Sequence, residues 1–133
     1  MKTYSIKIEK GCSRNSIDAP NASGLIFVYL LRRGNDGKYY YHELLEIISA
    51  ADIRSFLTQN MDNWTEQVTE KTEIYFLWAI VAPNIRTWVL AGLVNFYRPI
   101  LNEKFLDYFP FGRTEIICEG NLALLQKKTS IGE

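Results

Sequence analysis

The chain has 133 residues, a length typical of one domain, and we expect residues 1–133 to fold as a single unit. Its hydrophobic fraction of 47% and charged fraction of 23% are those of globular proteins and exclude a wholly disordered chain. Lys and Arg together number 15, and so do Asp and Glu. Because these charges cancel, any nucleic acid or anionic membrane must be held by a local patch.

Cysteine and histidine are too few for several kinds of site. Cys12 and Cys118 cannot supply a disulfide framework or a zinc site, and the single histidine, His42, excludes a multi-histidine metal centre. Charged residues interrupt the start of the chain, so no secretory signal is expected, and the longest apolar run, residues 74–83, is too short to cross a bilayer. We therefore expect a soluble, cytoplasmic protein with no membrane partner.

The first third of the chain predicts a strand, a loop and a β-hairpin. Residues 4–9 alternate apolar and polar side chains as a half-buried strand does, and residues 11–23 are rich in Asn and Ser and predict a loop. Residues 25–31 form an apolar run suited to a central strand. An Asp-Gly pair at residues 36–37 then favours a hairpin turn, and residues 39–48 predict the returning strand.

A helix and the centre of the sheet are expected next. Ser49 is a favourable helix N-cap with Asp52 three residues later, and the helix should end near Asn60. Residues 60–71 are polar and give only a weak signal for a second helix. Residues 72–82 are apolar on both faces, which predicts the buried centre of the sheet.

The rest of the chain predicts a long helix and short final elements. Pro83 and Asn84 begin a helix that runs to about Tyr97, where apolar side chains recur at helical spacing. Residues 102–109 suggest a helical turn, and residues 114–118 a last strand. The predicted fold is an α/β (α+β) domain with a small, largely antiparallel central sheet of three or more strands, flanked by helices.

Several of these segments resemble the GIY-YIG nuclease family. Its members begin with a Gly-Ile-Tyr strand, pass through a hairpin to a Tyr-Ile-Gly strand, and end a later helix in a Lys/Arg-Pro-x-x-Asn signature. Residues 23–26 resemble the first strand, and residues 47–53 resemble the second strand and the entry to the following helix. Residues 91–102, followed by Phe109 and Pro110, resemble the end of the later helix.

The resemblance covers residues 24–110 and implies a GIY-YIG-nuclease-like fold. It leaves residues 1–23 as an N-terminal strand and loop, and residues 111–133 as a C-terminal extension. Two family positions keep their residue type, Gly24 and Asn102, and both suit a structural role.

Four positions that carry the family's chemistry differ in this chain. The family's two tyrosines, its arginine and its metal-binding glutamate fall on Ile26, Glu46, Phe56 and Leu90. Phosphodiester hydrolysis needs a polarised water, a metal-bound carboxylate and a cation facing the phosphate, which Ile, Phe and Leu cannot supply. The resemblance therefore implies a catalytically degenerate domain with no catalytic residue, metal or cofactor, acting as a nucleic-acid-binding or interaction module.

A second hypothesis keeps the nuclease activity but relocates its residues. Tyr29 and Tyr40 would replace the tyrosines, Glu46 the carboxylate and Arg54 the cation, with Mg²⁺ as cofactor. It predicts that Arg54, Glu46 and a tyrosine converge on one pocket. Tyr29, however, lies three residues from Ile26 and would point to the opposite face of the strand.

The binding hypothesis has two forms that differ in the partner. For DNA or another nucleic acid, the candidate phosphate-binding residues are Arg32, Arg33, Lys38, Arg54 and Arg98. The zero net charge argues against tight binding that is independent of sequence. For a protein partner without nucleic-acid contact, we expect an exposed apolar patch around Trp64, Tyr108, Phe109 and Phe111, unless these aromatic side chains cover the core.

Overall fold

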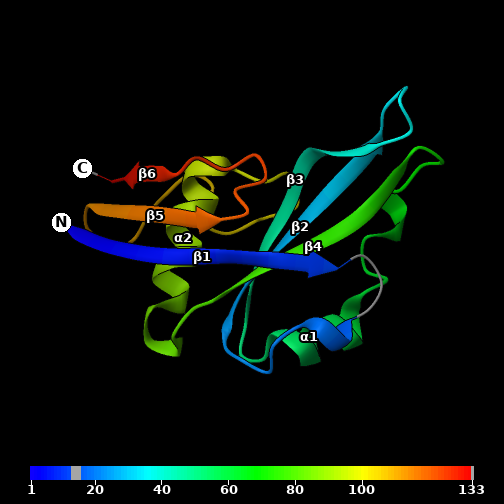
Figure 1. Ribbon diagram of the computed structural model, residues 1–133. Helices are drawn as coiled ribbons and strands as arrows, with labels where there is room; N and C mark the ends of the chain where they lie inside the picture. Colours follow the sequence, from blue (N-terminus) through cyan, green and yellow to red (C-terminus); the bar gives the residue numbers. More distant parts are fainter. Residues whose placement is uncertain (13–15, 133) are drawn as a thin grey trace.

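The computed structural model describes residues 1–12 and 16–132, so residues 13–15 of the predicted loop lie outside the described part of the chain. Within that part, a six-stranded mixed sheet packs with two helices (Figure 1). The strands are β1 (Lys2–Cys12), β2 (Gly24–Arg33), β3 (Tyr39–Ala50), β4 (Thr72–Ile80), β5 (Thr114–Gly120) and β6 (Lys128–Ile131). The helices are α1 (Ile53–Asn60) and α2 (Pro83–Tyr97), and 3₁₀ turns η1 and η2 span Ser16–Asp18 and Thr65–Gln67.

The strands lie in the order β3-β2-β4-β1-β5-β6 across the sheet. β2 pairs antiparallel with β3 and β4, and β4 pairs antiparallel with β1. β1 then pairs in parallel with β5, which pairs antiparallel with β6. The predicted α+β class and the interior position of β4 are confirmed, whereas β6 adds a strand that the sequence pattern does not predict.

β2 is buried on both faces and therefore needs cover on each side. Leu25, Phe27 and Tyr29 are fully buried in the main core, which includes residues of α2. Ile26 and Val28 alternate with them and are fully buried in a second core, which includes residues of α1. Burying each of these large side chains stabilises the folded state by about 1.5–3 kcal/mol. Because β2 is apolar on both faces, this gain is complete only when each face is covered, and a helix lies on each side.

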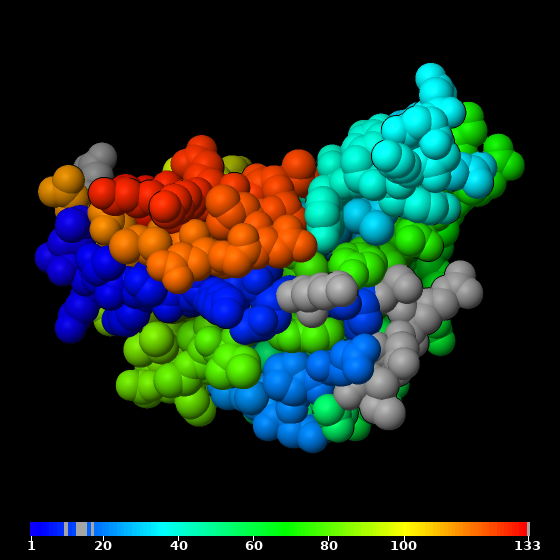
Figure 2. All heavy atoms as spheres, in the orientation of Figure 1, coloured from blue at the N-terminus to red at the C-terminus, as the bar shows by residue number. Residues whose placement is uncertain are grey.

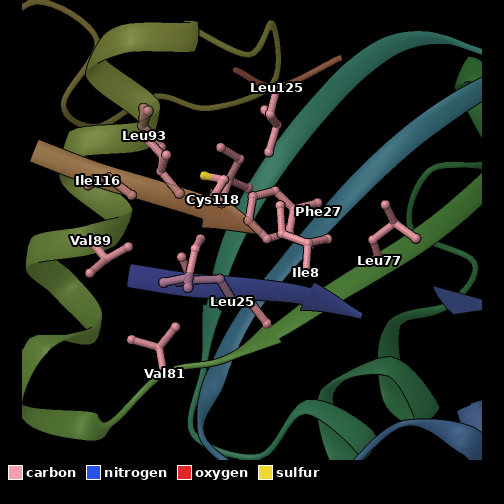
Figure 3. Packing of buried hydrophobic residues seen from close by; sticks show 14 of the residues in the cluster. Ile8, Leu25, Phe27, Leu77, Val81, Val89, Leu93, Ile116, Cys118 and Leu125 are labelled. Carbon is pink, nitrogen blue, oxygen red and sulfur yellow. The ribbon is translucent and has the colours of Figure 1, made fainter. Parts of the chain in front are cut away.

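The sheet curls around α2, which contacts β3 at one edge and β6 at the other. Figure 3 shows Val89 and Leu93 of α2 directed into the main core, close to Ile116 of β5. The side-chain amide of Asn121, just after β5, donates to the Tyr41 hydroxyl of β3 at 3.1 Å. This hydrogen bond links β3, at one edge of the sheet, to the segment that follows β5.

Two helix starts differ from the predicted ones. Asp52, rather than Ser49, caps α1, because its carboxylate accepts a hydrogen bond from the Ser55 amide at 3.0 Å while Ser49 remains in β3. Pro83 is the first residue of α2, but the cap is Ala82, which provides no side-chain hydrogen bond. The helical turn expected at residues 102–109 does not form, and the weak helix expected at 60–71 is reduced to the 3₁₀ turn η2.

One end of the sheet projects from the body as a three-stranded arm, which we define as residues 30–43 and 68–75 (Figure 1). Figure 2 shows the same projection in space-filling form. The predicted turn is confirmed at its tip, where Gly37 adopts a φ of 79° and the Gly34 amide donates to the Lys38 carbonyl at 2.8 Å. No described helix is long and apolar enough to cross a membrane.

Gly24→Ala tests how closely β2 and β4 are packed at the start of the hairpin. A Cβ at Gly24 would lie 2.1 Å from the Ala79 carbonyl oxygen and 2.7 Å from the Ile53 Cδ1 atom. Because the carbonyl is backbone, we expect the free energy of unfolding to fall by about 1–3 kcal/mol, measured by urea denaturation. Gly112→Ala, whose Cβ meets nothing within 4 Å, is the control, and equal stability of the two variants would contradict the packing.

Candidate functional site

The four positions that the resemblance assigns to the family's chemistry, together with the structural position Asn102, fall in two places. Glu46, Leu90 and Asn102 line one open pocket of about 310 Å³ between β3 and α2. Ile26 is fully buried in the second core, and Phe56 packs against the same core. Ile26, Phe56 and Leu90 thus lie in or against the packed interior. Of these five residues, only Glu46 carries a titratable group.

Glu46 is engaged with Trp64. The Trp64 indole N–H donates to the Glu46 carboxylate at 2.9 Å, and the indole ring packs edge-on against Phe76 with centroids 5.4 Å apart. Trp64 is only 4% exposed. The expectation that it belongs to an exposed apolar patch is therefore wrong, because β3 supplies a partner for its one polar atom and the second core covers the ring.

The aromatic residues that follow α2 mostly cover the core. Phe111 stacks on Trp88 with centroids 4.6 Å apart and planes 10° apart, and Phe109 packs against the main core. Tyr108, in contrast, is 59% exposed. The aromatic cluster thus closes the sheet around α2 and does not form the patch that was expected together with Trp64.

Asn102 joins the loop after α2 to the outer edge of β3. Its side-chain amide donates to the Ile47 carbonyl and accepts from the Ile47 amide, both at 2.9 Å. Next to it, the Leu101 amide donates to the Leu45 carbonyl at 3.0 Å. These contacts satisfy backbone groups that an edge strand otherwise leaves unpaired, so Asn102 has a structural role.

The residues of the relocated nuclease site are not brought together. Glu46 lies opposite Val28, on the face of the sheet away from Tyr29, whose ring is in the main core. Tyr40 lies in the arm opposite Arg32. Arg54 donates from its Nε atom to the Ala19 carbonyl at 2.6 Å, near the start of α1. The described residues also contain no group of three or more His, Cys, Asp or Glu side chains that could hold a metal ion.

The five candidate phosphate-binding cations are spread over three regions of the fold. Arg32, Arg33 and Lys38 lie in the arm, whereas Arg54 is in α1. Arg98 follows α2 with a φ of 51°, donates to the Leu106 carbonyl and forms an ion pair with Asp107 at 3.2 Å. The arm also carries Lys71 and four carboxylates, which are Asp36, Glu43, Glu70 and Glu73. Its positive charges are therefore balanced within the arm itself.

A cluster of tyrosines stiffens the base of the arm. The Tyr41 ring packs edge-on against Tyr29 and Tyr75, with centroids 5.0 and 6.3 Å away. The Tyr75 hydroxyl donates to the Gly11 carbonyl at 3.2 Å, which ties β4 to β1. The Tyr29 hydroxyl is buried with no hydrogen-bond partner in the part of the chain that the structure describes, and burial raises the pKa of Tyr29 well above its ordinary value. Rings from three strands thus hold the arm to the body.

Beyond this base, the arm presents two exposed tyrosines and borders a groove. Tyr39 and Tyr40 are 45% and 48% exposed. Tyr39 also lines an open groove of about 860 Å³ that lies between α1, η2 and the start of β4. Sequence reasoning missed this groove because its walls come from segments far apart in the chain; the only local signal is the frequency of threonine in residues 58–72.

Asn102→Ala tests the structural role of this amide. The substitution removes two hydrogen bonds and leaves the Ile47 amide and carbonyl unpaired at the edge of β3, so we expect the free energy of unfolding to fall by about 1–3 kcal/mol. Urea denaturation measures the change. Asn63→Ala is the control, since Asn63 is exposed and its side-chain amide donates to the side-chain oxygen of Asn60, at the end of α1. A loss no larger than that of the control would show that Asn102 does not hold this edge.

Comparisons with known proteins return nothing that resembles this chain. No family model matches it, and no curated protein or solved structure matches it either. The resemblance to the GIY-YIG nucleases therefore stays a prediction. A function for the chain has to be argued from the geometry of its own residues.

Proposed function

We propose that the chain is a catalytically degenerate relative of the GIY-YIG nucleases that acts as an interaction module and binds a partner protein through its arm. The observation that carries the proposal is the arm itself, which projects from the body and exposes Tyr39 and Tyr40 on a stiff base. Tyrosine is enriched at protein interfaces because its large ring loses little conformational freedom on binding. A stiff base further reduces the conformational freedom that the arm loses on binding.

The degenerate character of the proposed module is supported by the positions where the family carries its chemistry. Ile26, Phe56 and Leu90 offer neither a metal ligand nor a titratable group, and Glu46 accepts a hydrogen bond from Trp64. The section β3-β2-β4 is antiparallel and has helix residues packed against each face, as the resemblance implies.

A protein partner is favoured over nucleic acid by the distribution of charge. Affinity for nucleic acid comes largely from cations that neutralise phosphates. The arm carries four cations and four carboxylates, so its net charge is zero, and the remaining candidate cations, Arg54 and Arg98, are bonded elsewhere in the fold. An arm with balanced charge and exposed tyrosines suits the mixed apolar and polar surface of a protein.

Photocrosslinking from the arm tests this proposal. Tyr40 is replaced by p-benzoylphenylalanine, and the protein is irradiated in a lysate of the cells that produce it; Tyr108, exposed outside the arm, carries the same group in the control. We expect a discrete protein adduct from position 40 alone. Unlabelled protein should compete with the labelled protein and reduce the amount of adduct. Unlabelled Tyr40→Ala should compete about tenfold less well, because a tyrosine that contributes about 1.4 kcal/mol to binding changes the affinity by that factor.

Two outcomes would contradict the proposal. One is an adduct pattern that is the same from positions 40 and 108, or absent from both. The other is binding of duplex, single-stranded or branched DNA that weakens steeply with salt, followed by fluorescence anisotropy with Mg²⁺ present. Cutting of that DNA would favour the relocated nuclease instead.

A further inference from the structure

The arm has a hollow on the face where Arg32 lies opposite Tyr40. Its volume is about 490 Å³, within the range of ligand-binding clefts. Leu30 and Arg32 of β2 line it, together with His42 of β3 and residues of the connection between η2 and β4. The His42 ring lies edge-on to the Tyr40 ring, with centroids 6.3 Å apart. The hollow is therefore next to one of the two exposed tyrosines of the proposed interface.

Arg32 occupies the centre of this face. β2 is the middle strand of the arm, and Arg32 lies opposite Tyr40 of β3 on one side and opposite Thr72 of β4 on the other. Side chains directly opposite one another in a sheet lie on the same face, so the stem of Arg32 has a neighbour on each side. These neighbours reduce the conformational freedom that the side chain still has to lose when its guanidinium binds a ligand.

Hydrogen bonds hold the turn that forms the other wall of the hollow. The Thr69 amide donates to the Thr72 hydroxyl at 2.7 Å, and the Thr72 amide donates to the Thr69 carbonyl at 3.2 Å. The Arg33 amide donates to the Lys71 carbonyl at 2.8 Å, which fastens this turn to β2. Gln67 and Thr69 belong to the lining, and both side chains are neutral hydrogen-bond donors.

The charge around the hollow differs from that of the arm as a whole. The arm carries four carboxylates, but Glu70 is the one among them that belongs to the lining. Within the described chain, the carboxylates that form ion pairs bind Arg98 and Lys128 and not Arg32. Residues 13–15, outside the described part, are Ser, Arg and Asn and bring no carboxylate. The guanidinium of Arg32 is therefore available to an acidic group from another molecule.

We propose that this hollow binds an aspartate or glutamate side chain of the partner protein, with Arg32 holding the carboxylate and Tyr40 packing against the same segment. Arginine pairs with a carboxylate through two parallel N–H···O hydrogen bonds, which fix its orientation. Leu30, which packs against the second core, supplies an apolar floor for the methylene groups of the bound side chain. The inference rests on the proposed function, because it names the chemistry of the partner segment that meets the arm.

A single carboxylate fits this lining better than the phosphates of a nucleic acid. Nucleic-acid affinity depends on several cations that neutralise successive phosphates. In this hollow, Arg32 is accompanied by Lys71 and opposed by Glu70. A phosphate monoester carries more negative charge than a carboxylate, so Glu70 would repel it more strongly.

The single histidine of the chain makes this hollow easy to observe in the whole protein. The probe is a short peptide in which Glu and Ser alternate, and its matched neutral control has Gln in place of each Glu. Each peptide is titrated at constant pH while NMR follows the imidazole C–H signals of His42, which lines the hollow. The Glu peptide should shift these signals to saturation with an affinity that falls as salt is added, and the Gln peptide should leave them unchanged.

Substitutions with opposite expected effects assign the binding to Arg32. Arg32→Gln should weaken binding of the Glu peptide about fivefold, and Glu70→Gln should strengthen it about twofold, because the first removes an attraction and the second a repulsion. Arg32→Lys keeps the charge but loses the paired donors, so its affinity should lie between those of Arg32→Gln and the unchanged protein. Arg113→Gln removes an exposed cation outside the arm and should leave the affinity unchanged.

Three outcomes would overturn the inference. The first is equal binding of the Glu and Gln peptides, and the second is an unchanged affinity after Arg32→Gln. The third is a single-stranded oligonucleotide that binds more tightly than the Glu peptide and shifts the same His42 signals.

Failure here is distinguishable from failure of the proposed function. Crosslinking from Tyr40 needs no peptide, so a specific adduct at position 40 that forms equally well in the Arg32→Gln variant would keep the arm as the interface and remove only the hollow. Peptide binding that depends on Arg32, without any adduct at position 40, would keep the hollow and contradict the proposed function.

Discussion

The burial of β2 on both of its faces is the constraint on which the rest of the structure depends. Leu25, Phe27 and Tyr29 alternate with Ile26 and Val28, and all five are fully buried. A strand of this kind needs neighbours on both sides and a layer above and below it. The curl of the sheet around α2 covers one face and α1 covers the other. Only the far end of β2, where it enters the arm, is left beyond both helices (Figure 1).

The arm is therefore a consequence of strand length. β2 and β3 are 10 and 12 residues long, while α1 has only 8. The strands continue past the helix and carry polar and aromatic residues instead of a second apolar layer. Their position is fixed by the Tyr29, Tyr41 and Tyr75 rings rather than by a helix. An extension with a stiff base and exposed tyrosines is suited to contact another molecule.

Local sequence patterns predict the elements that form through contacts between residues close in the sequence. They fail where a residue distant in the sequence determines whether a strand forms or a side chain is buried. The hairpin at Gly37 and the helix that ends at Tyr97 follow from turn chemistry and helical spacing alone. β6 has only four residues and forms because β5 offers it an edge. Trp64 looks exposed among polar neighbours, yet Glu46, 18 residues earlier in the chain, provides its hydrogen-bond partner. The groove escapes prediction for the same reason, since its walls meet only after folding.

Amide hydrogen exchange along β4 tests the central claim most directly, because the proposed interaction requires an arm that is a stable part of the sheet. The amides of Glu73 and Tyr75 in the arm and of Leu77 in the body all point toward β2. We predict that Glu73 and Tyr75 exchange slowly, with protection close to that of Leu77, which is fully buried. Rapid exchange of Glu73 and Tyr75 beside a protected Leu77 would show that the arm is not a stable part of the sheet.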